Sequence, residues 1–324
     1  MRVVPFNAEL PVRVIHGFDA VTPALAGGVL TIGNFDGVHL GHRHILQTCA
    51  GLRSGKDAPV VAVTFEPHPL TIVAPQRAPR RLTALDEKLH QLGRGGADVA
   101  VVGHSDRQLL SMEADEFARG ILVDRFRPGH IVVGGDFGFG RGRRGNVDTL
   151  RTLAAEFGFG VTVAEPLYIE IDGARQVVSS SLIRSLLAAG KVETAGQGLG
   201  RPFLLCGTVT RGDSRGAGLG FPTANLAVEP DLIVPGEGVY SGFARLASGR
   251  RRAAISVGHV PTFDGRESRV EAFLLDYSGD LYGQPVGLEF HRFLREQRKF
   301  GSPAELVAQI ERDVAQVREL PHAD

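Results

Sequence analysis

The sequence has few cysteines, no excess of charge of either sign and no long hydrophobic run. Its two cysteines, Cys49 and Cys206, show no C-x-x-C or metal-binding spacing, so we expect both to pack as small apolar side chains in a reducing cytoplasm. Lys plus Arg and Asp plus Glu number 36 each, which excludes a global field that would recruit nucleic acid or an anionic membrane. The N-terminus lacks an apolar signal core, and no run of about 18 uncharged apolar residues occurs. We therefore expect a soluble protein with no nucleic-acid or membrane partner.

Glycine, in contrast, is abundant, and it gathers in a few segments where backbone amides could approach phosphate groups. The 42 glycines among 324 residues exceed the usual share of about 7%. The length is about twice that of a typical domain, and the 43% hydrophobic content suffices for packed cores. A short helical pattern gives way to glycine and proline between Ala188 and Pro202. We therefore predict two domains, residues 1–187 and 188–324.

Apolar, β-rich runs alternate with helical patterns through the first half. Strands that are apolar on both faces and are joined by helices predict an α/β fold, which is a parallel sheet with helices on both faces. In such a fold, ligands bind at the carboxyl ends of the strands. The predicted strands are Val29–Ile32, Val60–Phe65, Val99–Val102, Ile131–Val133 and Val161–Ala164, and helical patterns lie at 45–52, 85–92, 117–123 and 150–157.

From about Pro202 the rhythm changes to closely spaced strands separated by turn residues. This spacing predicts a small antiparallel barrel. Its predicted strands are Phe203–Val209, Val239–Leu246, Ala253–Val257, Val270–Tyr277 and Val286–Phe290. Ser302-Pro303-Ala304-Glu305 then provides a cap, a first-turn proline and a capping-box acid for a final helix against the barrel.

The first candidate site follows the strand Val29–Ile32, in the run Gly33-Asn34-Phe35-Asp36-Gly37-Val38-His39-Leu40-Gly41-His42. His39 and His42 are three residues apart, so at the start of a helix they project from one face, and Gly41 leaves room for a nucleotide. Helix amides and two imidazoles then converge on one anionic point. Such a group can stabilise charge on a phosphate while pyrophosphate leaves. The pattern alone also fits two surface histidines or a partial metal site.

Further motifs join this run in order. They are Thr64-Phe65-Glu66-Pro67-His68-Pro69, the glycine loop Gly134–Gly140, and Val178-Ser179-Ser180-Ser181-Leu182-Ile183-Arg184. Together they resemble the His-x-Gly-His nucleotidyltransferases, and specifically the adenylyltransferase module of the bacterial bifunctional riboflavin kinase/FAD synthetases. The resemblance implies a Rossmann-like nucleotidyltransferase domain.

Roles for single residues follow from this resemblance. It implies catalytic roles for His39 and His42, and flavin contacts for Phe65 and His68, which fit loop packing equally well. ATP contacts are implied for Gly33, Asn34, Phe35, Gly41, Asp136, Ser180 and Arg184, with Asp136 also in the flavin cleft. Arg184 suits phosphate because its guanidinium offers two donors, although a solvated helix arginine is the alternative.

The segment Gly140–Gly145 reads literally as G-x-G-x-x-G, with Glu165 ending the next strand. It therefore offers a rival hypothesis, an NAD-dependent oxidoreductase. Against it, the motif follows the fourth predicted strand rather than the first, and it places three arginines where a tight turn should lie. A mobile basic loop near ATP phosphates is the other interpretation.

The second candidate site begins in the glycine-rich loop from Gly212, which ends in Pro222-Thr223-Ala224-Asn225. No Walker sequence occurs in the chain, so an ATP site here needs other means to hold phosphates and metal. The hydroxyl of Thr223 and the amide of Asn225 are hard oxygen ligands that suit Mg²⁺.

This half resembles riboflavin kinase from Gly200 onward. The shared motifs include Gly238-Val239-Tyr240, Pro261-Thr262-Phe263, Val270-Glu271-Ala272, Asp280-Leu281-Tyr282-Gly283 and the segment from Leu294-Arg295 to Lys299-Phe300. The resemblance implies Glu271 as general base, Thr223 and Asn225 as ligands of Mg²⁺ and ATP, Gly216 and Gly220 as ATP contacts, and Arg295 in a flavin-side segment. From strand alternation alone, Glu271 and Arg269 share a solvated face.

Four positions depart from these resemblances. In the second half, the related sequences commonly have a basic residue in place of Ala217, Asn in place of Ser256, and Arg or Asn in place of Val260. In the first half, they commonly have Asp in place of Asn146. None is a predicted metal or base position, so we expect altered nucleotide affinity at most. A non-catalytic flavin-binding protein, with Arg250–Arg252 contacting RNA, is a further alternative, although that arginine run also fits a solvated hairpin turn.

The overall hypothesis is a pair of Mg²⁺-dependent reactions in the cytoplasm. Riboflavin and ATP give FMN and ADP in the second domain, and FMN and ATP give FAD and pyrophosphate in the first. The expected partners are therefore riboflavin, FMN, FAD and ATP. The sequence leaves open whether the chain forms a homo-oligomer.

Overall fold

The computed structural model describes residues 10–55, 57–211, 220–262 and 265–321. Contacts divide the chain into two compact units. The described residues of Glu9–Pro79 and Leu85–Ser179 form the sheet unit, and those of Arg80–Ala84 and Ser180–Asp324 form the barrel unit. No helix in the described ranges combines the length and the hydropathy that a membrane crossing requires.

The sheet unit contains a six-stranded parallel sheet in the order β1-β4-β3-β2-β5-β6. Its strands are β1 (Arg13–His16), β2 (Val29–Ile32), β3 (Val60–Glu66), β4 (Val99–His104), β5 (His130–Gly134) and β6 (Gly160–Ala164). After β2, the strands β3 and β4 are added in turn on one side of β2, and β5 then pairs with the other side of β2. The strand order therefore reverses at β2 and β5, and the loops after such strands form a ligand crevice in α/β sheets.

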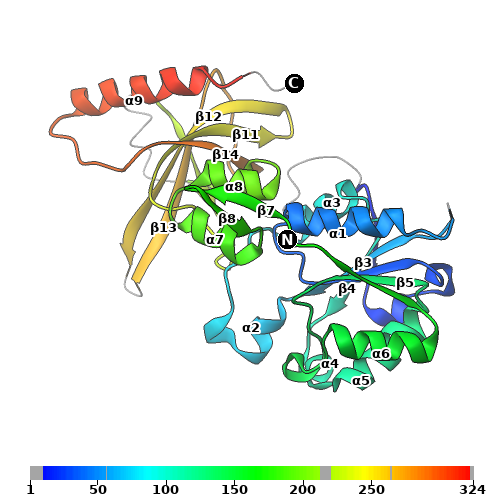
Figure 1. Cartoon of the computed structure of the whole chain (residues 1–324). Helices are drawn as coiled ribbons and strands as arrows, with labels where there is room; N and C mark the ends of the chain where they lie inside the picture. Colours follow the sequence, from blue (N-terminus) through cyan, green and yellow to red (C-terminus); the bar gives the residue numbers. More distant parts are fainter. Residues whose placement is uncertain (1–9, 56, 212–219, 263–264, 322–324) are drawn as a thin grey trace. The chain divides into compact units, whose positions relative to one another are not determined.

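Two hydrophobic cores cover the two faces of this sheet, because successive strand residues point to opposite sides. On one face, Val29, Val60 and Ala100 pack with α1 (Leu40–Gly51) and α3 (Leu85–Arg94). The other face packs with α5 (Ala114–Phe117), the π-helical segment η4 (Ala118–Phe126) and α6 (Val147–Phe157). Figure 1 shows α1 and α6 on opposite sides of the sheet. The predicted α/β class with helices on both faces is confirmed.

Smaller elements complete the unit and were absent from the sequence prediction. They are β1, α2 (Pro69–Val73), α4 (Arg107–Ser111), the antiparallel hairpin β7 (Tyr168–Ile171) and β8 (Ala174–Val177), and 3-10 turns at Phe18–Ala20, Pro23–Leu25, Pro75–Arg77 and Arg141–Arg143. The helical pattern at 117–123 forms, but as a short α-helix that continues into a π-helix. It ends at Arg127, which has a positive φ and precedes Pro128.

The barrel unit is a closed antiparallel barrel in the order β10-β13-β12-β11-β14-β9. Its strands are β9 (Phe203–Thr210), β10 (Thr223–Ala227), β11 (Gly238–Leu246), β12 (Gly249–Thr262), β13 (Gly265–Leu274) and β14 (Pro285–Arg295). This confirms the predicted barrel. The sequence prediction missed β10, whose residues Thr-Ala-Asn-Leu-Ala include no run of β-branched or aromatic residues.

Three helices accompany the barrel: α7 (Ser180–Ala188), α8 (Val192–Leu199) and α9 (Pro303–Arg318). The last helix packs on β11 and β12 (Figure 1). The hydroxyl of Ser302 caps it by accepting the Glu305 N–H at 3.3 Å, whereas the Glu305 carboxylate accepts the N–H of Gly301 rather than that of Ser302. The predicted C-terminal helix and its cap are therefore confirmed, with the capping-box acid displaced by one residue.

The segment Arg80–Ala84 belongs to the barrel unit although it lies in the first half of the sequence. The N–H of Arg81 donates to Asp231 O at 2.7 Å, and Ile233 N–H donates to Arg81 O at 2.9 Å. Its guanidinium forms ion pairs with Glu229 and Asp231, both at 2.7 Å. These bonds tie the segment to the connection that follows β10.

Candidate active sites

The loop between β2 and α1 turns through unusual backbone conformations. All four β2 residues are buried, and Phe35, Gly37 and Val38 then adopt positive φ angles of 47°, 82° and 38°. Positive φ is uncommon outside glycine. Here the conformation directs the side chains of Phe35 and Val38 into the core, where they are 1% and 0% exposed. The loop is therefore anchored by apolar burial immediately before the two histidines.

His39 and His42 lie together at the N-terminus of α1. Their rings stack with centroids 3.6 Å apart and an interplanar angle of 19°, and Phe35 meets His42 edge to face at 5.1 Å. His39 is the N-cap, and its Nδ1 accepts the His42 N–H at 3.3 Å. A neutral His39 therefore carries its proton on Nε2. The structure thus brings the two predicted imidazoles together at the start of a helix.

Burial and nearby positive charge hold the His42 ring neutral. Desolvation, followed by the proximity of His39 and of Lys88, lowers the pKa of His42 well below 6.5. Its Nδ1 is buried and has no hydrogen-bond partner among the residues that the structure describes. A neutral, incompletely bonded imidazole beside a helix N-terminus can gain a proton when a phosphate arrives, because a nearby anion raises the pKa.

Gly41 makes the stacked arrangement sterically feasible. A Cβ added here would lie 3.1 Å from both Cε1 and Nδ1 of His39 and 3.4 Å from Val178 O. The first two distances are tighter than ordinary van der Waals contact, so a side chain would displace the His39 ring. At Gly33, an added Cβ would meet the Phe35 ring at 3.5 Å, an ordinary contact.

The end of β3 supplies neighbours on one side of this loop. Asn34 Nδ2 and His68 Nε2 are 3.2 Å apart, and the Thr64 hydroxyl donates to Asn34 O at 3.1 Å. The structure thus brings Asn34 and His68, two of the predicted site residues, together. Phe65 instead packs in the hydrophobic core, with its ring 6.4 Å from that of Phe18.

The loop after β5 lies on the other side of β2. Asp136 is exposed there, and its carbonyl accepts a hydrogen bond from Arg143 Nη2 at 2.6 Å. A Cβ on Gly134 would lie 3.2 Å from Asp136 Oδ1 and 4.0 Å from Ile45 of α1. Small residues at the strand end therefore let the Asp136 carboxylate fold back toward α1.

Gly140–Gly145 does not form the turn of a dinucleotide-binding fold. The segment is a 3-10 turn whose Arg141 N–H donates to Met112 O at 2.7 Å, and Phe139 and Gly145 form an antiparallel bridge. A Cβ on Gly140 would meet the Ala114 backbone at 2.6 Å, and one on Gly145 would meet the Ala114 and Phe139 side chains at 2.8 Å, so these two glycines serve close packing. Helix α6 begins only afterwards, where the Asn146 side chain accepts the Thr149 N–H at 3.0 Å. Asn146, one of the noted departures, is thus an N-cap, a role that Asn and Asp fill about equally.

Ser180 and Arg184 lie on α7, in the barrel unit. Ser180 is its first residue, and Arg184 follows one turn later with its Nε donating to the carbonyl of Arg80 at 2.7 Å. Arg184 is half-buried.

The second site lies on the outer face of the barrel. Val270, Ala272 and Leu274 of β13 point into its core, so Glu271 points outward, directly opposite Asn225 of β10. Thr223 is two residues before Asn225 and therefore shares its face. The structure thus brings Thr223, Asn225 and Glu271 together. Gly220 is exposed with a φ of +86°, and Gly216 and Ala217 lie outside the described residues.

Three further side chains, Arg269, Ser256 and Gln297, lie beside Thr223, Asn225 and Glu271, and the sequence assigned none of them a catalytic or binding role. Arg269 Nε lies 2.7 Å from Glu271 Oε1 and donates to Asn225 Oδ1 at 3.2 Å. On the other side of Glu271, Ser256 of β12 is its cross-strand neighbour, and Gln297 Nε2 donates to the Ser256 hydroxyl at 2.7 Å. Arg269 and Glu271 share the outer face, as strand alternation indicated, and both are half-buried there.

Arg295 is held by the final helix. Its guanidinium binds the buried carboxylate of Asp313 with contacts of 2.8 and 3.1 Å, and its Nη1 donates to Glu296 O. Arg298 reaches Gln309 of the same helix at 2.6 Å. Arg295 therefore ties the end of β14 to α9, a connection that no local sequence signal predicted.

A buried ionic cluster joins three barrel strands. The Glu289 carboxylate of β14 contacts the guanidinium groups of Arg245 and Arg250 and lies 3.3 Å from His291 Nε2. Burial alone would raise the pKa of Glu289, but the His291 hydrogen bond and the two arginines outweigh it and lower the pKa to about 2. Arg250 also lies over the Phe243 ring, 3.6 Å from its centroid. Arg250 is thus a structural partner rather than part of a solvated turn.

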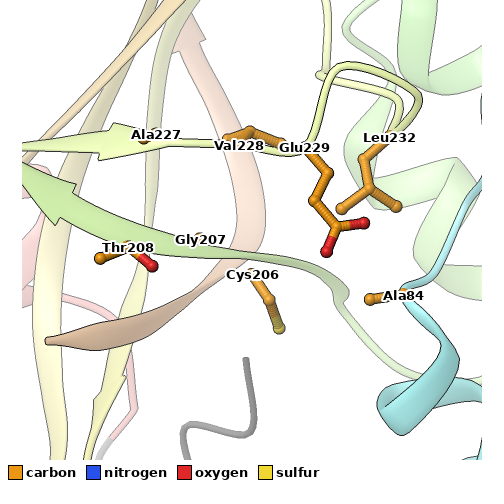
Figure 2. Close-up of a pocket in the computed structure, with 8 residues that line it drawn as sticks. All are labelled: Ala84, Cys206, Gly207, Thr208, Ala227, Val228, Glu229 and Leu232. Atoms are coloured by element: carbon orange, nitrogen blue, oxygen red, sulfur yellow. The ribbon is translucent and has the colours of Figure 1, made fainter. Parts of the chain in front are cut away.

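Figure 2 shows a small pocket elsewhere on the barrel unit. It has a volume of about 220 Å³, and no predicted site residue lines it. Its walls are formed by Ala84, Cys206, Gly207, Thr208, Ala227, Val228, Glu229 and Leu232. Cys206 and Cys49 are free thiols and both are buried, as predicted.

The sheet unit carries paired histidines where its strand order reverses, and the barrel unit carries an amide and a carboxylate on neighbouring strands. This combination is typical of a nucleotide-dependent transferase. Family comparison agrees with this class. The FAD synthetase family model matches residues 22–182, and the riboflavin kinase family model matches residues 199–320.

Relatives along the whole chain are named bifunctional riboflavin kinase/FMN adenylyltransferase. The protein from Escherichia coli K12 is 37% identical over 310 residues, covering 95% of this chain and 97% of the relative. That from Bacillus subtilis is 32% identical over 312 residues, covering 93% and 95%. The chain belongs to the bifunctional riboflavin kinase/FMN adenylyltransferase family.

A solved structure agrees with the two-unit architecture. The crystal structure named as a macrolide-efflux protein from Streptococcus pneumoniae is 28% identical, with a TM-score of 0.84 over 96% of this chain and 100% of that one. Its name describes a different activity from the one on which the family models and curated relatives agree. This protein phosphorylates riboflavin and adenylylates FMN, with ATP as co-substrate of both reactions. Neither the oxidoreductase hypothesis nor the non-catalytic one is supported.

Proposed function

We propose that the adenylyl transfer takes place where β2 ends and α1 begins, with His39 and His42 as its catalytic residues. The stacked imidazole pair at a helix N-terminus is the observation that carries this assignment. Gly33, Asn34, Phe35 and Gly41 would line the ATP side, and Asp136 would face both nucleotide and flavin. His68 is supported as a flavin-side residue by its contact with Asn34, whereas Phe65 would act by packing.

In the proposed reaction, a phosphate oxygen of FMN attacks the α-phosphorus of ATP. An O–P bond forms to give FAD, and the bond to the leaving pyrophosphate breaks. Negative charge accumulates on the phosphate oxygens, and His39, His42 and the first amides of α1 stabilise it without a covalent intermediate. The neutral free state of His42 lets it gain a proton as that charge arrives. Ser180 and Arg184 stay proposed phosphate contacts on the family resemblance alone.

We further propose that riboflavin phosphorylation takes place on the outer face of the barrel, with Glu271 as general base. The 5′-hydroxyl of riboflavin attacks the γ-phosphorus of ATP, the bond to ADP breaks, and the hydroxyl proton passes to the Glu271 carboxylate. The direct cross-strand pairing of Glu271 with Asn225 carries this assignment. Gly220 is a proposed ATP contact, and Arg295 would hold the flavin-side segment in place through Asp313.

The residues beside Glu271 fit a divalent cation. The Thr223 hydroxyl and the Asn225 amide oxygen share one face of β10, and both are hard oxygen donors of the kind that Mg²⁺ prefers. Asn225 Oδ1 already accepts a hydrogen bond from the Arg269 guanidinium, which supports it as an oxygen that can bind a cationic group. Bound there with ATP, Mg²⁺ would neutralise charge on the transferred phosphoryl group. We also propose that adenylyl transfer requires Mg²⁺.

The proposed division of labour follows the predicted domains, with adenylyl transfer in residues 1–187 and phosphorylation in residues 188–324. Both reactions consume ATP and the two cysteines are free thiols, which supports a cytoplasmic location.

Two variants of the full chain test the assignment. We expect His42→Ala to convert riboflavin to FMN but to form no FAD, and Glu271→Gln to form no FMN while still converting supplied FMN to FAD. Incubation with ATP and Mg²⁺ followed by chromatographic separation of the flavins measures both. Loss of both activities in either variant, with an unchanged circular dichroism spectrum, would contradict two separate sites.

A further inference from the structure

Arg269 makes an unusual pair of contacts at the kinase site. Its Nε lies 2.7 Å from the Glu271 carboxylate and 3.2 Å from the amide oxygen of Asn225. The Arg269 and Glu271 side chains are 31% and 28% exposed, so the contact is half-buried. A single guanidinium thus bridges the proposed general base and a proposed metal ligand.

The barrel register explains why the side chain reaches both groups. Arg269 and Glu271 are two residues apart on β13 and share its outer face. On the β12 side, the cross-strand partner of Arg269 is Gly258, which offers no side chain to pair with. On the β10 side, Asn225 lies opposite Glu271 and accepts the hydrogen bond.

The same two oxygens are those that a divalent cation would seek. Mg²⁺ binds carboxylate and amide oxygens, and the guanidinium already supplies one positive charge at this position. A metal ion bound to Asn225 would lie close to that charge, and like charges repel at short range even near a protein surface. Guanidinium and metal ion therefore compete for Asn225 Oδ1.

We propose that Arg269 is a positioning residue that holds Asn225 and Glu271 together before the metal binds and weakens the binding of that metal. Mg²⁺ entry requires the guanidinium to leave Asn225, while its pairing with Glu271 keeps the carboxylate oriented. Arg269 thereby raises the metal concentration that the kinase needs. This inference rests on the proposed metal site at Thr223 and Asn225.

Binding of Mn²⁺ in the presence of ADP tests the proposal without turnover. Electron paramagnetic resonance of the full chain measures free Mn²⁺. We expect Arg269→Gln to bind Mn²⁺ at the kinase site about 5-fold more tightly, the factor that corresponds to about 1 kcal/mol for a half-exposed charge pair. Arg269→Lys, which keeps the charge, should stay within about 2-fold of the wild type, and the gap between Gln and wild type should shrink in high salt.

Two controls separate this inference from the function on which it rests. Thr223→Ala should abolish the kinase-site fraction of bound Mn²⁺, and in that background Arg269→Gln should change nothing. If Thr223→Ala has no effect, the proposed metal site is wrong. If Thr223→Ala removes the site but Arg269→Gln leaves Mn²⁺ binding unchanged or weaker, the role of Arg269 is overturned.

A matched variant checks for a general charge effect. Arg292→Gln removes one positive charge from an exposed position of β14 and should leave Mn²⁺ binding as it is. Steady-state kinetics supply a second measurement, since Arg269→Gln should lower the apparent KM for Mg²⁺ in FMN formation while kcat falls. An equal tightening in Arg292→Gln would contradict the specific competition at Asn225.

Discussion

In the sheet unit, His39 and His42 are three residues apart and are placed by one loop and one helix end. In the barrel unit, Asn225 and Arg269 meet across 44 residues of sequence, through the pairing of two strands. The first site is therefore fixed by local backbone conformation, whereas the second exists only when the barrel closes in its native register. A defect in strand packing should consequently affect phosphorylation before it affects adenylyl transfer.

Breaking the ionic cluster of the barrel should give the largest effect. Glu289→Gln leaves Arg245 and Arg250 without their buried carboxylate, and loss of one partner of a buried pair costs about 3 kcal/mol or more. We expect urea denaturation at pH 7 to show this loss, with FMN formation failing at lower urea than FAD formation. Because the native pKa of Glu289 is about 2, its contribution to the free energy of unfolding is fully present above pH 4.5 and decreases as the pH falls toward 2.

A matched carboxylate-to-amide change at an exposed position provides the control. Glu296→Gln should alter the free energy of unfolding by no more than about 0.5 kcal/mol. Equal effects at 289 and 296 would show that the buried cluster does not stabilise the barrel.

Crowding the helix start tests whether the sheet site depends on backbone geometry. An added Cβ at residue 41 presses on the His39 ring at 3.1 Å, so Gly41→Val should reduce FAD formation about 100-fold, and Gly41→Ala about 10-fold. FMN formation should be unchanged in both. Gly51→Ala, at the other end of α1 with open space around its Cβ, is the control, and steady-state rates with FMN and ATP are the measurement.

The buried histidine gives the sheet unit a pH dependence of its own. Because the native pKa of His42 lies below 6.5, the unfolded chain binds the proton first, and stability falls as the pH drops below 6.5. Between pH 6.5 and 5.5, we expect the free energy of unfolding to fall by about 1 kcal/mol more in the wild type than in His42→Gln. Urea titrations without ligand measure this difference. Above pH 7.5 the two proteins should show the same slope, and parallel curves throughout would refute the lowered pKa.

The smallest expected effect concerns the cap of α6. Asn146→Ala removes the acceptor for the Thr149 N–H and should cost about 1 kcal/mol of unfolding free energy, whereas Asn146→Asp should cost only a few tenths. Thermal unfolding monitored by circular dichroism measures both. A loss as large in the Asp variant would argue that Asn146 acts through something other than capping.

Much of the fold could be predicted because its signals are periodic. Buried strands such as Val29–Ile32 and the capped helix after Ser302 show their pattern within a few residues. The exceptions have physical reasons. The strand β10 contains Ala224 and Asn225, which have low strand propensity, and it is held by its pairing with β9 and β13.

The candidate sites also contain parts that local sequence patterns predict and parts that they do not. The three-residue spacing of His39 and His42 predicted that they lie close together at a helix start, but their stacking also depends on the extended backbone of the N-cap His39. The Arg269 bridge, the Arg295–Asp313 pair and the Glu289 cluster depend on cross-strand register and on where α9 packs, which single-sequence patterns do not determine. The proposed role of Glu271 follows only from family resemblance, since alternation alone indicates a surface acid.

The segment Arg80–Ala84 has a consequence for the inheritance of the two activities. Its backbone pairs beside Leu232, and Arg81 is the partner of Glu229 and Asp231. A gene divided at any point between the codons for residues 84 and 180 would encode the barrel on a chain that lacks the segment Arg80–Ala84. Among the described residues, the barrel unit is thus encoded in two stretches separated by residues 85–179 of the sheet unit, so no continuous piece of the gene encodes this barrel without that part of the sheet unit.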